Sequence, residues 1–298
     1  MTINTLTFVF HWIFMVLTIH YTIIVFAVQK LSNNSSFFYI FKYAAICDVF
    51  SCIALAWINL FRSTLFSPIY LYTSHLAAAI ECSCITISLL LNGMMAINRY
   101  HSTFVSYSLY WKINKLPKWI IILTIIGLII NVPFYLDDRD FELVNGTSWK
   151  MTRYPWNTAY INWMLNVLIA CVQTVGVIAT AMTLYRLHVH NIVYTPERNL
   201  IYVTLVHIIV YLILLYAYLS EIFDPTGISF IQRNFSVVLE FLSISMNSVT
   251  IILINRNIRE EYKTIIFFCT KKRHSNPTVS VISITQHPTE YRAMTKVA

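Results

Sequence analysis

The sequence predicts an all-α membrane protein, built as a seven-transmembrane helix bundle. Hydrophobic residues make up 57% of the 298-residue chain and charged residues only 11%, whereas soluble domains carry about 25% charged residues. Seven apolar stretches follow one another along the chain. Each is about 20 residues long, the length that a helix needs to cross a hydrocarbon core of ~30 Å. The basic residues fall mainly in alternate loops, as is typical of multi-pass membrane proteins.

The apolar stretches define the expected spans. These run over about 7–28, 38–61, 74–97, 118–136, 158–185, 198–220 and 232–254. Four segments contain no Asp, Glu, Lys or Arg at all: 1–29, 119–136, 154–185 and 199–220. The other three spans carry one membrane acid each, namely Asp48, Glu81 and Glu240. Helices that are apolar on every side are typical of lipid-embedded segments.

The distribution of basic residues predicts the orientation. With the loops assigned alternately and the C-terminus inside, 16 of the 21 Lys and Arg residues fall on the inner side. The positive-inside rule then places the N-terminus outside and the C-terminus in the cytosol. The net charge of +8 therefore faces anionic membrane lipid and not nucleic acid. We expect an integral, multi-pass protein of the plasma membrane.

A short amphipathic helix is expected directly after the last span. Over about 256–268, Ile258, Tyr262, Ile265 and Ile266 fall at helical spacing with charged residues between them, which is typical of a helix lying in the membrane interface. Cys269 follows it and is a candidate for palmitoylation; an ordinary free thiol is the alternative. The polar tail 269–298 is expected to be a disordered cytoplasmic segment, which leaves 1–268 as the membrane domain.

The longest outer loop, 137–158, carries the candidate glycosylation site. Asn145-Gly146-Thr147 matches the acceptor sequence for N-linked glycans. Three other sequons, at Asn33, Asn34 and Asn234, lie on an inner loop or too near the membrane. A chance match at Asn145 is the alternative.

Two ionisable residues bracket the third span. Glu81 and Arg99 are eighteen residues apart, which is five helical turns, so both project from one face about 27 Å apart. Ionisable side chains inside a membrane usually face the bundle interior and mark function. One helix would thus join an acid in the outer half to a base at the inner boundary. In the alternative, Arg99 extends to the headgroups and Glu81 is protonated or paired internally.

The sixth and seventh expected spans carry further polar residues. Glu240 and Asn247 belong to one polar stripe of the seventh span, and His207 and Tyr211 share a face of the sixth. Two acids at similar depth, Glu81 and Glu240, would suit a cationic ligand or share a proton. Interhelical hydrogen bonding is the alternative for the stripe, and a core histidine for His207.

Asp48 in the second span suits an internal polar network or a bound cation. His11 and His20 in the first span are expected to have no functional role. No metal site, cofactor site or catalytic constellation is recognisable, so we do not expect an enzyme.

Asn98-Arg99-Tyr100, at the end of the third span, resembles the D-R-Y signature of rhodopsin-like G-protein-coupled receptors, with Asn in place of the acid. The resemblance implies that Arg99 faces the cavity that receives a heterotrimeric G protein. It also places Glu81 where aminergic receptors keep a ligand-binding acid. Asn247-Ser248 stands where N-P-x-x-Y would begin, but the Pro and Tyr are absent.

With these departures from the rhodopsin-like pattern, the chain more closely resembles the nematode serpentine chemoreceptors of the Srg superfamily, including the Srv and Sru branches. The matching segments are N-R-Y-H-S at 98–102, T-P-E-R-N-L at 195–200 and N-R-N-I-R at 255–259. The resemblance covers about 1–268. It implies a small-molecule ligand, a G protein as partner and location in a sensory cilium.

Together these features predict a chemosensory G-protein-coupled receptor. A small molecule would bind in an outer cavity near Glu81, His207, Tyr211 and Glu240. Asn98, Arg99, Tyr100 and Asn247 would serve activation, with Glu197 pairing with Arg99 at rest. The alternative is a small transporter or a cation or proton channel. We rank it lower because transporters usually contain repeats and helices broken by Gly or Pro, whereas this chain has five Gly in total and only Pro133 lies deep within a span.

Overall fold

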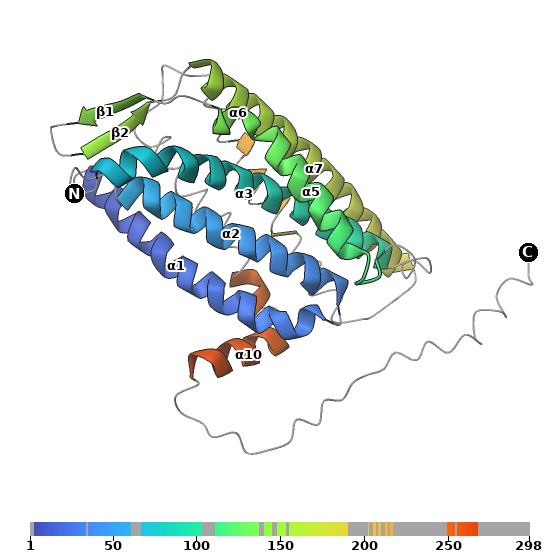
Figure 1. The fold of residues 1–298 in the computed structure, drawn as a ribbon. Helices are drawn as coiled ribbons and strands as arrows, with labels where there is room; N and C mark the ends of the chain where they lie inside the picture. The colour runs from blue at the N-terminus through green and yellow to red at the C-terminus, as the bar shows by residue number, and fades with distance from the viewer. Residues whose placement is uncertain are drawn as a thin grey trace, which may run out of the picture. The chain divides into compact units, whose positions relative to one another are not determined.

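The computed structural model describes most of the first two thirds of the chain and a segment near its end (Figure 1). The described residues are 3–33, 35–60, 67–102, 111–136, 140–144, 148–152, 155–189, isolated positions between 202 and 216, 249–253 and 255–267. The contacts divide the chain into one unit of residues Met1–Ile266 and a second of Phe267–Ala298. Of the second unit only Phe267 is described, so the expected tail 269–298 lies outside the described residues.

Helices dominate the described residues. Their bounds are α1 Ile3–Ser32, α2 Ser36–Leu60, α3 Ser67–Ser102, α5 Leu116–Ile130, α6 Val132–Tyr135, α7 Pro155–Val189 and α10 Arg256–Ile266. They occupy the ranges in which the sequence predicts the first five spans and the amphipathic helix. The expected spans over 198–220 and 232–254 lie mostly outside the described residues.

Three of these helices are long and apolar enough to cross a membrane, within the part of the chain that the structure describes. They are Ser36–Ile58, Pro68–Ser102 and Asn166–Arg186. Two shorter apolar helices, Met15–Gln29 and Leu116–Ile130, accompany them. The chain is therefore an α-helical membrane protein. The total of seven spans and the orientation in the membrane stay predictions.

The packed core lies where α2 contacts both α1 and α3 (Figure 1). Tyr21 and Ile24 of α1, Phe41 of α2 and Leu91 of α3 are buried there. Ala44 and Ala45 of α2 are also buried, and small residues of this kind allow helix backbones to approach closely. In contrast, large apolar side chains along α5 and α7 are exposed, as lipid-facing surfaces require.

The range of the fourth expected span, 118–136, contains two helices with a break between them. α5 ends at Ile130 and α6 begins at Val132, with Asn131 between them at φ −95° and ψ 7°. Pro133 is the cause, because proline has no N–H to donate to the preceding turn and its ring clashes with it. The Asn131 amide instead donates to Thr86 Oγ1 at 3.0 Å and to the Gly127 carbonyl at 2.7 Å, which ties the break to α3.

The predicted outer loop 137–158 contains regular structure that the sequence analysis did not anticipate. Asp140–Val144 (β1) and Ser148–Thr152 (β2) form an antiparallel pair in which Phe141 lies opposite Met151. The Phe141 ring lies 6.2 Å from the ring of Tyr70 on α3, in an edge-to-face arrangement. The hairpin therefore contacts the first turn of α3. Asn145 lies between the strands in the chain, outside the described residues.

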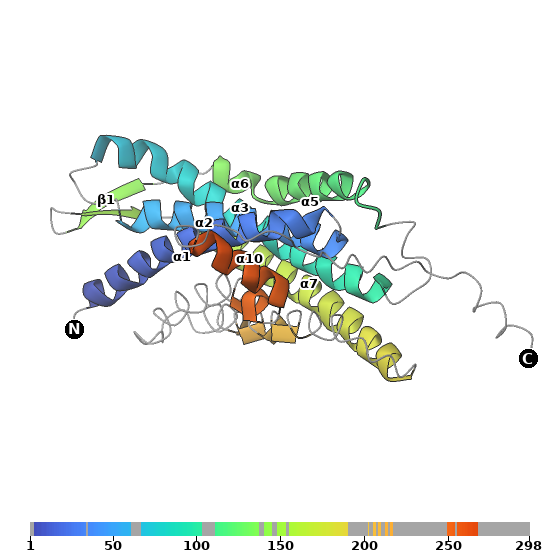
Figure 2. The same ribbon diagram turned by 90° about the horizontal axis from the view of Figure 1, so that it is seen from below.

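α10 packs against α1 (Figure 2). Asn255 Oδ1 accepts hydrogen bonds from the backbone N–H groups of Asn257, at 3.0 Å, and Ile258, at 3.2 Å. These bonds satisfy donors that have no partner inside the helix, and so fix where α10 begins. Ile258 is fully buried, and Tyr262 and Ile265 also pack on the core. α10 is thus amphipathic; its position at the inner membrane surface stays a prediction.

Candidate functional site

α3 carries the candidate functional residues that the structure describes. It packs against α2, α5 and α7 (Figure 1). Ser88, Asn92, Asn98 and Arg99 are buried along it, and Glu81 is half-buried. α3 is a single helix over Ser67–Ser102, so Glu81 and Arg99 belong to one continuous element, about 27 Å apart along its axis.

A buried carboxyl group lies in the middle of the contact between α2 and α3. Ser88 Oγ donates a hydrogen bond of 2.8 Å to Asp48 Oδ1, and both side chains are buried. Ser51, one turn beyond Asp48 on α2, is also buried. The Ser88–Asp48 hydrogen bond is an internal polar contact, and an internal polar network is one of the two roles that the sequence suggests for Asp48. Within the described residues, no group of three or more His, Cys, Asp or Glu side chains is placed to hold a metal ion.

The two buried serines near Asp48 provide a matched test of this network. Replacing Ser88 with alanine should lower the free energy of unfolding by about 1–3 kcal/mol, because a buried carboxyl loses a hydrogen-bond donor. Ser51 Oγ has no hydrogen-bond partner among the described residues, so Ser51→Ala should change stability little. Thermal unfolding of the two purified variants in detergent checks this. Equal losses from both would show that the Ser88–Asp48 bond has no special role.

Asn98 and Arg99, near the end of α3, contact the first turn of α2. Asn98 Nδ2 donates a hydrogen bond of 3.1 Å to Ser36 Oγ, and both groups are buried. The Arg99 guanidinium carbon lies 4.0 Å from the centre of the Phe37 ring, a favourable cation–π contact. Arg99 is only 7% exposed, which argues against a side chain that extends to the headgroups. The charge is thus held inside the helix bundle, at the end of α3.

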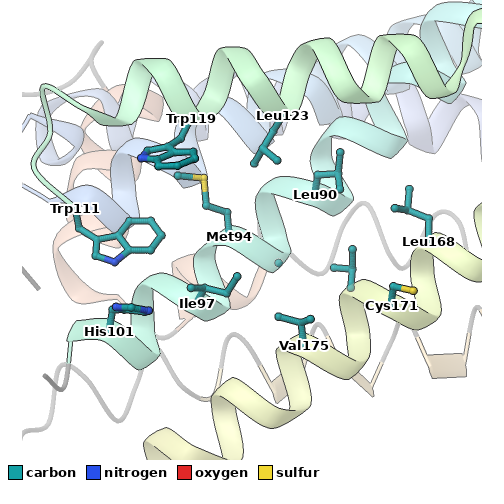
Figure 3. A pocket seen from close by; sticks show the side chains of 12 residues that line it. Leu90, Met94, Ile97, His101, Trp111, Trp119, Leu123, Leu168, Cys171 and Val175 are labelled. Carbon is teal, nitrogen blue, oxygen red and sulfur yellow. The ribbon is translucent and has the colours of Figure 1, made fainter.

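An apolar groove lies beside this end of α3, between α5 and α7 (Figure 3). Its volume is about 550 Å³, within the usual range for ligand pockets. Leu90, Met94 and Ile97 of α3 form its floor, with Trp119 and Leu123 on the α5 side. On the α7 side, Leu168, Cys171, Val172 and Val175 line it. His101 and Trp111 stand at one end, with ring centres 6.0 Å apart.

Of the candidate ligand-binding, activation and modification residues that the sequence analysis named, the structure describes four. Glu81, Asn98, Arg99 and Tyr100 lie on α3. The others lie outside the described residues: Asn145, Glu197, His207, Tyr211, Glu240, Asn247 and Cys269. The outer ligand cavity, the resting Glu197–Arg99 pair, the glycan and the palmitoyl group therefore stay predictions.

His20 has a partner that the sequence did not suggest. Its Nδ1 lies 2.5 Å from the Tyr262 hydroxyl of α10, and the two ring centres are 5.2 Å apart. Burial raises the pKa of Tyr262 above its usual value near 10, so the hydroxyl keeps its proton at neutral pH and can donate to the imidazole. The helical spacing of Ile258 and Tyr262 predicted an amphipathic helix at the membrane interface, but nothing in the sequence indicated that the tyrosine contacts α1.

Comparison with family models and with curated proteins does not identify the chain. No known family model matches it, and no curated protein matches it either. The described geometry supplies two distinct environments on α3. One is the set of buried polar residues where α3 contacts α2, which includes Asp48, Ser88 and Arg99, and the other is an apolar groove open between α5 and α7. The second suits an apolar ligand.

Proposed function

We propose that this protein is a chemosensory G-protein-coupled receptor with seven spans, its N-terminus outside and its C-terminus in the cytosol. A small molecule binds in the outer half of the bundle, near Glu81, and a heterotrimeric G protein binds at the end of α3 that carries Arg99. The observation that carries this proposal is the buried Arg99 guanidinium stacked on Phe37, next to the Asn98–Ser36 hydrogen bond. A buried cation is costly, so its retention at a helix end favours a functional role.

The proposed mechanism is a shift between two arrangements of the helices. In the resting arrangement, Asn98 and Arg99 are held against the first turn of α2, and the Asp48–Ser88 bond joins α2 to α3 nearer the middle. A ligand that binds the other arrangement more tightly shifts the population toward it. Release of Arg99 from Phe37 then presents a positive charge and donor groups to the G protein. The proposed location is the plasma membrane, and the sensory cilium of a chemosensory cell.

Expression in cells that carry a panel of G-protein reporters tests this function. A screen of volatile and soluble small molecules should find a ligand that activates one reporter class. Arg99→Ala should lower that response at least about tenfold, because it removes the charge and donors offered to the partner. Arg256→Ala, which removes an exposed charge on α10, serves as the control and should respond like wild type. Surface labelling should confirm that all three proteins reach the membrane equally.

Equal responses from wild type and Arg99→Ala would contradict the proposed role of Arg99. The alternative, a transporter or a cation or proton channel, predicts a different result. In that case, bilayers that hold only this protein would pass a ligand-dependent current, and Asp48→Asn would change it. The receptor proposal predicts no such current.

A further inference from the structure

We propose that the groove between α5 and α7 is a binding site for one anionic phospholipid, with an acyl chain along α3 and the headgroup at the Trp111 end. This inference requires that α3 and α7 cross the membrane. It does not require receptor activity, and its test measures lipid binding alone.

The groove has the length and lining of an acyl-chain site (Figure 3). Leu90 and His101 are eleven positions apart on α3 and both line the groove, which corresponds to about 16 Å along the helix axis. One leaflet contributes about 15 Å, half of the ~30 Å hydrocarbon core. Between these two residues, the part of α3 that lines the groove consists of Met94, Ile97 and the bare backbone of Gly93. A single chain of one leaflet therefore matches the groove in depth as well as in polarity.

The groove is open toward the bilayer. Trp119 of α5 and Cys171 and Val175 of α7 line it and are exposed. A ligand can thus enter sideways between α5 and α7 without crossing an aqueous opening. Gly93 closes the base of the groove: a Cβ there would lie 2.9 Å from Val172 Cγ1, so α3 and α7 are already in contact behind the chain.

One end of the groove offers a hydrogen-bond donor that lacks an acceptor. Trp111 Nε1 is buried and has no hydrogen-bond partner among the described residues. A buried N–H without an acceptor is unfavourable, and an ester carbonyl or phosphate oxygen at this point would satisfy it. Tryptophan is also the residue type that prefers the headgroup level of a membrane. The polar part of the ligand therefore belongs at Trp111.

The charges around this end select an anionic headgroup. Lys112 follows Trp111 in the chain, Lys118 precedes Trp119, and Lys115 lies between them; all three are exposed. The N-terminus of α5, at Leu116, lies in the same segment and adds a partial positive charge. The segment 111–119 contains no acidic residue. A phosphatidylserine-type or phosphatidylglycerol-type headgroup complements this charge, whereas a sterol does not.

Photocrosslinking with defined phospholipids tests the proposal. The purified full-length chain is reconstituted in phosphatidylcholine nanodiscs with a small fraction of phosphatidylserine that carries a diazirine on one acyl chain. After irradiation, labelled peptides are mapped by mass spectrometry. We expect labelling of peptides that contain Leu90–Ile97 and Leu168–Val175. The same acyl chain on phosphatidylcholine should label them about fivefold less for each lysine that contributes.

α7 provides a matched pair of variants. Val175 and Val177 are both 43% exposed, but only Val175 lines the groove. Val175→Trp should lower labelling by about tenfold, because the larger side chain excludes the acyl chain. Val177→Trp should label like wild type. Trp111→Phe keeps the apolar ring and removes the donor, and should lower labelling by about fivefold. Monodisperse size-exclusion profiles should show that the variants are folded.

Three results would overturn the proposal. The first is equal labelling in the Val175→Trp and Val177→Trp proteins, with Trp111→Phe also unchanged, which would mean that the probe reports bulk lipid. The second is equal labelling by the phosphatidylserine and phosphatidylcholine probes, which would show that the groove does not select an anionic headgroup. The third is stronger labelling of the same peptides by a sterol diazirine than by either phospholipid, which would assign the groove to a sterol.

Discussion

Replacing Gly127 with leucine should separate α5 from α3 and leave little folded protein. A Cβ atom at Gly127 would lie 2.5 Å from Ile87 Cγ1 and 3.6 Å from the Ile87 Cα atom. Ile87 is buried in the core, so a shift of its side chain would disturb the residues packed around it. The Asn131 amide bonds to both the Gly127 carbonyl and Thr86 Oγ1 at this contact, so separation of the helices would break those bonds as well.

The expected cost follows from the size of the clash. Overpacking by a few atoms usually costs about 1–3 kcal/mol, and total stabilities are only about 5–15 kcal/mol. Gly127→Ala should lose about 1–3 kcal/mol, and Gly127→Leu should lose more and fall into the aggregated fraction. The measurement is the yield of monodisperse protein in mild detergent, followed by thermal unfolding of what remains.

A second glycine supplies the control. At Gly176 of α7, a Cβ would lie 3.6 Å from Ile208 Cγ1, an ordinary van der Waals distance. Gly176→Ala should therefore be neutral or stabilise by about 0.5–1 kcal/mol, because alanine loses less backbone entropy in a helix. If Gly127→Ala were as stable as Gly176→Ala, the close contact between α5 and α3 would be wrong.

Composition and periodicity were sufficient to predict where the helices lie. Apolar stretches of about 20 residues coincide with α1, α2, α3 and α7, because helix length in a membrane is set by the bilayer thickness. The break at Asn131 could also have been predicted, since Pro133 lies inside the span. The hairpin β1–β2 had a signal too: Asn145-Gly146 is a turn dipeptide, and apolar and polar residues alternate on either side of it.

The contacts between helices could not be predicted in the same way. The separation of Glu81 and Arg99 follows from 3.6 residues per turn, because both lie on one helix. The Asp48–Ser88 and Asn98–Ser36 bonds depend on which helices are neighbours and on their rotation, which one sequence does not specify. The His20–Tyr262 contact joins residues 242 apart. The apolar groove is formed by side chains from three helices. From the sequence alone, its lining residues could not be distinguished from ordinary lipid-facing or core residues.

α10 should detach from α1 when Ile258 is replaced with asparagine. Ile258 is 0% exposed and packs in the core of the bundle. Removing a buried aliphatic side chain costs about 2–5 kcal/mol, and a buried amide without partners adds to that cost. α10 has only eleven residues, and isolated helices of that length are marginal in water. Once undocked, it should therefore lose its helical hydrogen bonds and exchange its amide protons rapidly.

Hydrogen exchange of the peptide that covers 256–266 measures this detachment. Ile266, at 46% exposed on the same helix, gives the matched control, and Ile266→Asn should leave protection nearly unchanged. Tyr262→Phe removes only the hydroxyl that meets His20, so exchange should accelerate about fivefold, the effect of one hydrogen bond. If Ile258→Asn kept the protection of wild type, α10 would be held by the membrane surface and not by α1. The graded order of the three variants separates these two causes, because a helix held only by lipid would respond to the exposed Ile266 as strongly as to the buried Ile258.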